Sequence, residues 1–219
     1  MILSDEIKNN YKLRENKAHL YAESDYTVHS QREIIDCISD FLKREFKHYA
    51  NLELLEIGAG NGTNADFFIN MGFTKANISF NELLPERINA IKTNYPQNKI
   101  FEGNAIDIDF DKQYDVIFQS TVFTSILNQN DRDKLGQKML GLLKQNGVII
   151  WYDFIYNNPK NKNVRKVSVN ELKKIFYNSS AFYYKKITLA PPIGRKVGSF
   201  YKLFNINILR THILAIIKK

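Results

Sequence analysis

The chain has 219 residues, of which 44% are hydrophobic and 25% are charged, a balance typical of one globular domain with a single core. Its N-terminus lacks the basic, apolar and small-residue pattern of a secretory signal, and no apolar run approaches the roughly 20 residues that cross a bilayer. We therefore expect a cytoplasmic protein with no transmembrane segment. The single cysteine, Cys37, excludes an internal disulfide, and no Cys/His spacing indicates zinc, so we expect no metal.

The net charge of +8 is unevenly distributed. Residues 160–219 contain 14 Lys and Arg against one acid, Glu171, whereas residues 1–159 contain 17 basic and 22 acidic residues. This asymmetry favours an anionic partner near the C-terminal third: nucleic acid, an acidic small molecule or a membrane surface. A solvated basic face with no partner is the alternative.

Apolar strands alternate with helical patterns along most of the chain. Capping boxes at Ser30–Glu33 and Ser168–Glu171 predict two helix starts, and Asp131 is the expected N-cap of another helix that stops near Gly147. The predicted strands are 52–57, 77–81, 99–102, 114–119, 148–153, 181–189 and 208–217. The predicted helices are 30–48, 63–71, 85–94, 131–145 and 168–178.

Five strands that alternate with helices predict a parallel sheet covered on both faces, because parallel strands need helical crossovers. No helix is predicted between the last two strands, so we expect them to pair antiparallel at one edge of the sheet. In such sheets, ligands bind beyond the carboxyl ends of the strands, where the strand order reverses.

The stretch "LLEIGAGNGT" places three glycines, Gly58, Gly60 and Gly62, between a strand and a helix. Glycines there let the backbone approach a ligand, and the helix N-terminus offers N–H groups. A dinucleotide loop would have its third glycine at position 63, which is Thr63, and no phosphate-binding Gly-Lys-Ser/Thr follows. The acid before the loop, Glu56, favours a cationic group on the ligand.

Two further elements follow the next strands. Glu82 ends the second strand about 20 residues after the loop, where a carboxylate accepts both hydroxyls of a ribose. Asn104 and Ala105 follow the third strand, where a side-chain oxygen and a backbone N–H can read an adenine edge. Separately, Glu82 also fits a surface acid near a helix start, and Asn104 fits an ordinary turn.

In this order and spacing, the glycine loop, Glu82, Asn104 and "YDVIFQ" resemble class I S-adenosylmethionine-dependent methyltransferases over roughly residues 50–155. The resemblance implies an α/β Rossmann-like fold: a mostly parallel seven-stranded sheet with helices on both faces and an antiparallel last strand. It implies S-adenosyl-L-methionine as cofactor. Members often have Asp where this chain has Glu82 and Asn104; Glu82 keeps the acceptor role, and Asn104 keeps one acceptor without the charge. The implied cofactor-binding residues are Glu56, Gly58, Ala59, Gly60, Gly62, Glu82, Leu83, Asn104, Ala105 and Gln119.

The strings "LLPERI", "QSTVFTSIL", "WYDFIYNNPKNKNVR", "TLAPP" and "LRTHILAIIKK" resemble a bacterial group within this superfamily. Some of its members are associated with gene neighbourhoods for surface polysaccharides and secondary metabolites. The group's substrate does not carry over to this chain. Nitrogen methylases of nucleobases and of glutamine have Asn/Asp-Pro-Pro-Tyr after the fourth strand, where this chain has Gln119-Ser-Thr-Val122, which argues against methylation of a base amine.

The acceptor side is predicted from residues at the strand ends and in the flanking segments. The candidate catalytic residues are Asp153 and His29. Asp153 is the candidate general base, because a hydroxyl acceptor must lose a proton, and His29 lies with Tyr21 and Tyr26 where such enzymes often place a lid. The alternatives are that Asp153 ends an ordinary buried strand and that His29 is a polar residue near a helix start. The expected substrate-binding residues are Tyr26, Thr121, Tyr152, Asn157, Arg165 and Arg195.

We expect one domain over residues 1–219, with a helical cap (1–50), a cofactor-binding core (51–155) and a basic substrate side (156–219). The predicted function is O-methylation of a sugar, a glycan precursor or another small, acidic metabolite. The rivals are an RNA methyltransferase and a non-catalytic regulatory module that binds S-adenosylmethionine. The RNA reading predicts binding that weakens steeply with salt, although no RNA-binding module is visible. The oligomeric state is not predicted.

Overall fold

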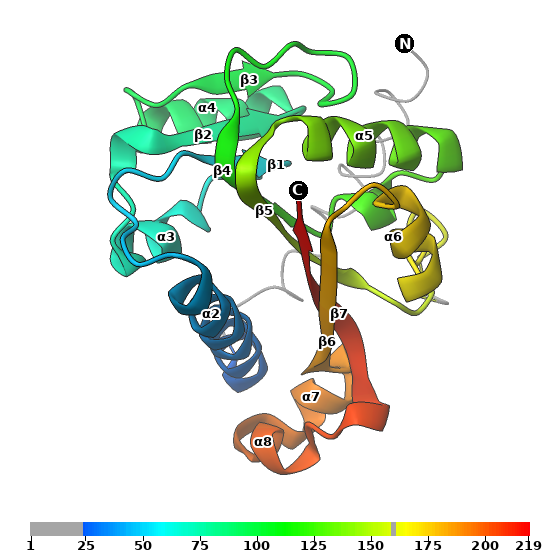
Figure 1. The fold of residues 1–219 in the computed structure, drawn as a ribbon. Helices are drawn as coiled ribbons and strands as arrows, with labels where there is room; N and C mark the ends of the chain where they lie inside the picture. Colours follow the sequence, from blue (N-terminus) through cyan, green and yellow to red (C-terminus); the bar gives the residue numbers. More distant parts are fainter. Residues whose placement is uncertain (1–23, 159–160) are drawn as a thin grey trace.

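The computed structural model describes residues 24–158 and 161–219 of the chain. In this part of the chain, seven strands form one sheet in the order β3-β2-β1-β4-β5-β7-β6 (Figure 1). The first five strands run parallel, and β7 runs antiparallel between β5 and β6. The predicted fold class is therefore confirmed, and all seven predicted strands are present. Their bounds are β1 (Leu54–Ile57), β2 (Ile78–Glu82), β3 (Ile100–Glu102), β4 (Tyr114–Ser120), β5 (Leu143–Phe154), β6 (Ala181–Leu189) and β7 (Arg210–Lys218).

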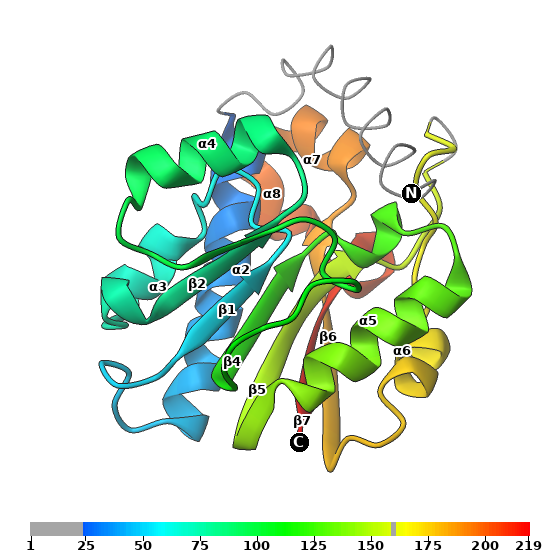
Figure 2. The ribbon, with the colours of Figure 1, turned by 90° about the horizontal axis from the view of Figure 1, so that it is seen from above.

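Helices cover both faces of the sheet because its buried strands alternate apolar side chains between the two faces. One face packs against α5 and α6, and the other packs against α2, α3 and α4 (Figure 2). The helices are α2 (Asp25–Glu45), α3 (Ala65–Met71), α4 (Pro85–Asn94), α5 (Gln129–Gly141), α6 (Val169–Ile175), α7 (Pro191–Val197) and α8 (Tyr201–Phe204). Short 3₁₀ turns are η2 (Lys75–Asn77), η3 (Phe123–Ser125), η4 (Gly198–Phe200) and η5 (Asn207–Leu209).

The first capping-box prediction was wrong. Helix α2 begins at Asp25, and its cap is Ser24, whose side chain accepts a hydrogen bond from the Thr27 amide at 3.2 Å. Ser30 lies inside the helix and donates to the Thr27 carbonyl oxygen. The second predicted helix start is confirmed, because Ser168 caps α6 and accepts from the Glu171 amide at 3.1 Å; the Glu171 carboxylate accepts from Arg132 and Arg165.

The predicted bounds of α5 were wrong at both ends. The cap is Asn128, three residues before Asp131, and it accepts from the Asn130 amide at 2.8 Å. The helix ends at Gly141, and β5 already begins at Leu143, which pairs with Tyr114 before a register shift. Gly147 thus lies within a strand, where an added Cβ would be 3.0 Å from a backbone carbonyl of β4.

The segment between the last two strands contains helices, against prediction. Residues 190–209, here called the insertion, hold α7, η4, α8 and η5. These pieces are too short for a helical period, and they pack on α2 around a small separate core of Tyr26, Leu189 and Tyr201. Because β6 runs parallel to β5, the insertion leaves the sheet at the edge where β1 to β5 also end.

Candidate active site

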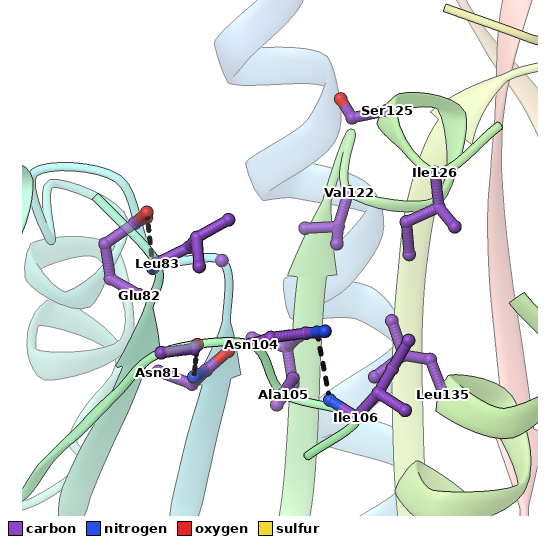
Figure 3. Close-up of a pocket in the computed structure, with 13 residues that line it drawn as sticks. Asn81, Glu82, Leu83, Asn104, Ala105, Ile106, Val122, Ser125, Ile126 and Leu135 are labelled. Atoms are coloured by element: carbon purple, nitrogen blue, oxygen red, sulfur yellow. Dashed lines mark hydrogen bonds between the residues drawn. The ribbon is translucent and has the colours of Figure 1, made fainter. Parts of the chain in front are cut away.

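A pocket lies beyond the carboxyl ends of β1 to β4, where the strand order reverses between β1 and β4. In Figure 3, Glu82 and Leu83 stand on one side of this first pocket, and Val122, Ser125 and Ile126 stand on the other. Of the predicted cofactor residues, the pocket brings together Gly58, Glu82, Leu83, Asn104 and Ala105. The remaining lining residues are Ile57, Asn81, Gly103, Ile106, Val122, Ser125, Ile126 and Leu135.

The glycine loop needs its glycines at two positions for different reasons. Gly58 has φ +64°, and an added Cβ would be only 2.5 Å from Val122 Cγ2. Gly60 has φ +59°, and an added Cβ there would have open space around it. A side chain at position 58 would therefore collide with the opposite wall, whereas at position 60 the backbone conformation alone favours glycine.

The Glu82 carboxylate joins two loops at the pocket. It is 4% exposed, its Oε2 accepts from the Gly60 amide at 2.7 Å, and its Oε1 accepts from the amides of Leu83 and Leu84 at 2.8 and 3.0 Å. Because a carboxylate offers about four acceptor directions, it keeps capacity for a ligand hydroxyl.

Glu56 is buried behind the loop with one oxygen unsatisfied. Its Oε1 accepts from Asn64 Nδ2 at 2.7 Å, and Oε2 has no partner within the described residues. Burial raises the pKa of Glu56 to about 8, the Asn64 hydrogen bond opposes this rise, and the nearby Glu82 charge adds to it. A buried carboxylate in this state is stabilised by a positive charge placed beside it.

Two asparagines shape the far side of the first pocket. Asn81, which sequence reasoning did not single out, donates from Nδ2 to the carbonyl oxygens of Phe101 and Gly103 and so ties the end of β2 to the turn after β3. Asn104 donates to Asp107 at 2.8 Å and accepts from the Ile106 amide at 3.2 Å. Its amide is thus held in place beside Ala105, at the predicted adenine edge.

The other predicted cofactor residues lie behind the pocket wall. Ala59 is buried, and its amide donates to the Asn81 carbonyl oxygen. Gln119 is fully buried; it donates to the Tyr152 carbonyl oxygen at 3.2 Å and accepts from the Val122 amide at 3.0 Å. Gln119 therefore holds the turn after β4, and Gly62 packs near the Tyr95 ring.

A second pocket of about 160 Å³ lies beside the first. The turn after β4 separates the two, because Thr121 and Thr124 line the second pocket while Val122 and Ser125 line the first. Thr121 has φ +59°, a strained value for a β-branched residue. The other lining residues are Phe154, Tyr156, Asn158, Asn161, Val164 and Lys166.

Asp153 lies directly behind the second pocket and has no exposed surface. Its Oδ1 accepts from Thr124 Oγ1 at 2.6 Å and from the Phe154 amide, and its Oδ2 accepts from the Thr124 amide at 3.1 Å. Burial raises the pKa of Asp153 to about 6, against the effect of these hydrogen bonds and of Arg132. The carboxylate thus holds η3 and reaches the second pocket only through the Thr124 hydroxyl.

Arg132 holds together the segments around the second pocket, and it was not identified from the sequence. It is fully buried on α5 and donates to the carbonyl oxygens of Ile126, Arg165 and Lys166 and to Glu171 Oε1 at 2.6 Å. Burial lowers the pKa of Arg132. The signal was available: Arg132 occupies the apolar face of a helix whose next inward residues are Leu135, Gly136, Met139 and Leu140.

The predicted lid residues meet the insertion instead of lining either pocket. His29 stacks on Tyr201 with ring centroids 5.6 Å apart. The Tyr26 hydroxyl donates to the Leu189 carbonyl oxygen, and the Arg195 guanidinium lies 5.9 Å from the Tyr26 ring centroid. Tyr21 lies outside the described residues.

The remaining predicted substrate residues are spread around the second pocket. Tyr152 is buried, stacks on His212 and shares a 3.0 Å hydrogen bond with Thr188. Asn157 accepts from the Lys166 amide at 2.9 Å, and Arg165 donates to Gln129 and Glu171. Of the six residues predicted to bind substrate, Thr121 lines the second pocket, and Asn157 and Arg165 flank residues that line it.

Two features bear on other ligands and partners. In the described part of the chain, no group of three or more His, Cys, Asp and Glu side chains is placed to hold a metal ion. None of its helices combines the length and apolar character needed to cross a bilayer.

Comparison with known proteins gives a family model and a set of structures. Residues 54–147 match the model described as "Methyltransferase domain". No curated protein matches the chain in sequence. An S-adenosylmethionine-dependent methyltransferase from Clostridium acetobutylicum is similar in structure, with a TM-score of 0.63 at 12% identity over 94% of this chain and 98% of that one.

Two further structures come from enzymes with named acceptors. Magnesium protoporphyrin IX methyltransferase from Synechocystis, solved with bound SAH, has a TM-score of 0.64 at 10% identity over 96% of each chain. Phosphoethanolamine N-methyltransferase 1 from Haemonchus contortus, in complex with phosphoethanolamine and S-adenosylhomocysteine, has a TM-score of 0.66 at 12% identity over 99% of this chain and 49% of that one. At such identities the likeness shows the fold, and the acceptors of these relatives differ widely.

Proposed function

We propose that this chain, whose residues 54–147 match a methyltransferase domain, transfers a methyl group from S-adenosylmethionine to a hydroxyl of a small acidic metabolite, such as an acidic sugar or glycan precursor. The observation that carries the proposal is the first pocket, at the point of strand-order reversal, with the glycine loop and Glu82 at its edge. The matched domain and the shared fold support the methyl-transfer activity.

The residues of the first pocket fit this donor. Glu82 offers its remaining acceptor capacity for a ribose hydroxyl, and the apolar side chains of Leu83, Ile106 and Leu135 suit a planar base. The unsatisfied Glu56 oxygen behind the loop suits a ligand that carries positive charge. When bound, S-adenosylmethionine supplies a methyl group made electrophilic by the positive sulfur.

The second pocket is the proposed acceptor site. It shares the turn after β4 with the first pocket, so its occupant would lie next to the donor site. Lys166 and the amides of Asn158 and Asn161 line it, and these groups suit a phosphate or carboxylate on the acceptor. The basic C-terminal third supplies the field that attracts such a molecule.

A proton route for a hydroxyl acceptor runs through Thr124. The acceptor hydroxyl would give its proton to Thr124 Oγ1, while the Thr124 proton moves to Asp153 Oδ1, 2.6 Å away. Asp153, with a pKa of about 6, is ionised at neutral pH and can take up that proton. The role predicted for Asp153 as a base is thus kept as a proposal, with Thr124 as its contact to the acceptor. No such route involves His29, which lines neither pocket.

An acceptor screen tests the proposal. The purified chain is incubated with isotope-labelled S-adenosylmethionine, below saturation, and separate pools of nucleotide sugars, sugar acids, neutral sugars and RNA, with Glu82→Ala as the control with weakened donor binding. We expect label in an acidic small-molecule pool and much less label with the control. Label confined to RNA or to neutral sugars would overturn the acceptor assignment.

The proton route is tested with three variants on the acceptor so found. Thr124→Val and Asp153→Asn should each lower kcat by roughly 100-fold or more, the size typical of a lost general base. Thr124→Ser, which keeps the hydroxyl, should retain most of the activity. In the wild type, kcat should fall as the pH drops through about 6, as Asp153 gains a proton. Normal turnover by Asp153→Asn would remove it as the base.

A further inference from the structure

The insertion carries an exposed apolar surface that neither pocket uses. The described part of the chain has eleven exposed large hydrophobic side chains, and five of them lie in one nine-residue stretch of the insertion, residues 200–208. We call them the apolar patch: Phe200, Leu203, Phe204, Ile206 and Ile208, which are 67%, 73%, 42%, 53% and 81% exposed. Single exposed apolar residues are ordinary, but such a concentration marks an interaction surface.

The apolar patch is held outward by the packing beneath it. Tyr201 points inward, and its hydroxyl donates to Glu33 Oε2 at 2.7 Å and accepts from the Leu189 amide. Asn205 Nδ2 donates to Glu33 Oε1 at 2.8 Å. Since Tyr201 and Asn205 fasten the insertion to α2, the side chains between and beyond them are left facing away from the protein.

Basic side chains accompany the apolar patch. Within the insertion, Arg195, Lys196 and Lys202 are exposed, and residues 172–219 contain no Asp or Glu. The acid that meets the insertion from α2 at its outer end is Asp25, whose Oδ2 would lie 3.4 Å from a Cβ added at Gly198. Cationic and apolar side chains on one short segment match the surface of an anionic bilayer, which offers negative headgroups above hydrocarbon.

We propose that the insertion docks this protein on the surface of an anionic membrane, with the apolar patch entering the boundary between headgroups and acyl chains and with Lys196 and Lys202 on the headgroups. The composition of the patch favours this occupant over single-stranded RNA: three of its five side chains, Leu203, Ile206 and Ile208, are aliphatic and offer hydrocarbon contact but no stacking surface for bases.

The insertion follows the carboxyl end of β6, and both pockets lie beyond the carboxyl ends of the parallel strands, so all three are at the same end of the sheet. When this protein docks through the insertion, the end of the sheet that holds both pockets therefore faces the lipid surface. This inference does not depend on the acceptor, because membrane binding can be measured without methyl transfer.

Vesicle sedimentation with the full chain tests the proposal. Vesicles of phosphatidylcholine alone are compared with vesicles that also contain phosphatidylglycerol, at low and at high salt. We expect binding to the anionic vesicles only, weakened by salt. The double variant Leu203→Ser/Ile208→Ser should bind at least about tenfold more weakly, because it removes two side chains from hydrocarbon. Lys196→Gln/Lys202→Gln should lose a similar factor on anionic vesicles.

Matched controls make the outcome decisive. Tyr177→Ser removes an equally exposed (71%) side chain outside the insertion, and Lys173→Gln/Lys174→Gln removes two exposed lysines of α6. Both should bind like the wild type, and all variants should keep its melting temperature because the changed side chains are exposed. Binding by Leu203→Ser/Ile208→Ser equal to that of the wild type would overturn the proposal. So would a patch-dependent dimer or patch-dependent RNA binding in the absence of vesicle binding.

Discussion

The two pockets share one wall but are built in different ways. One side of the first pocket is formed by turns that directly follow β1, β2 and β3, and hydrogen bonds from backbone amides to Glu82 hold two of these turns together. The second is formed by segments far apart in the chain, and buried charges hold them: Asp153 holds η3, and Arg132 holds residues 165 and 166. The first pocket therefore depends mainly on local turns at the strand ends, and the second on contacts between distant segments of the chain.

The largest expected effect is on the wall of the second pocket. Arg132→Met should lower the free energy of unfolding by about 3–5 kcal/mol, because it leaves carbonyl oxygens and Glu171 without their buried donor. Urea unfolding measures the change. The matched control, Arg44→Met on the exposed surface of α2, should change stability by less than about 0.5 kcal/mol. Equal effects of the two substitutions would show that the buried guanidinium does not organise this wall.

The next effect is on the first pocket. Glu82→Ala should weaken binding of S-adenosylmethionine by at least about tenfold, the scale of lost hydrogen bonds to a charged group. Titration calorimetry measures this, with Glu102→Ala, an exposed acid at the end of β3, as the control. Glu82→Gln keeps the shape of the side chain and separates lost charge from a disturbed loop. Unchanged affinity in Glu82→Ala would refute the ribose assignment.

Glu56 gives a pH-dependent effect of intermediate size. With a pKa raised to about 8, it is mostly protonated at neutral pH when no ligand is bound. If a positive ligand group stabilises the charged form, affinity should rise several-fold from about pH 6 to about pH 8 and level off as the α-amino group of the ligand loses its proton. This rise should be absent in Glu56→Gln. If the affinity of the wild type changes with pH as little as that of Glu56→Gln, Glu56 does not interact with a positive group of the ligand.

The same group predicts a stability trend without ligand. Because the raised pKa means that the folded chain holds a proton that the unfolded chain has lost, the free energy of unfolding should fall as the pH rises from about 4.5 towards about 8. Glu56→Gln should remove its share of this slope. An identical slope in both proteins would show that Glu56 does not titrate in this range.

The smallest effect concerns the charge at the acceptor side. Lys166→Gln should raise the KM for an acidic acceptor by roughly two- to fivefold, because Lys166 is exposed and its interactions are screened. Added salt should reduce the difference between the two proteins, and Lys162→Gln serves as the matched exposed control. If both substitutions raise the KM equally, Lys166 contributes only to the overall positive charge that attracts the acceptor and does not contact it.

The same contrast explains what could be predicted from sequence. The strands were found because each is a short apolar run between turn residues, and the first pocket followed because Gly58, Glu82 and Asn104 each come just after a strand. The second pocket depends on Thr124 and Asp153, which are hydrogen-bonded across 29 residues of chain, and on Arg132, whose partners at positions 165, 166 and 171 are 33 to 39 residues away. Asp153 was identified because it ends a strand, and Arg132 stands at an inward position of α5, but neither position indicates these distant partners. The insertion was missed for the same reason, since its small core joins Tyr26 to Leu189 and Tyr201 across 163 residues of chain.

The position of β7 has a consequence for how the chain reaches this structure. In the sheet, β6 pairs only with β7, although β6 comes first in the sequence. β6 can therefore join the sheet only through β7, either after β7 has inserted beside β5 or together with it as a β6–β7 pair. Before it pairs with β7, β6 has both edges unpaired, and unpaired strand edges promote association between partly folded chains. The insertion, which ties β6 to β7 and binds α2, therefore also acts as the connection that brings the final strand into register.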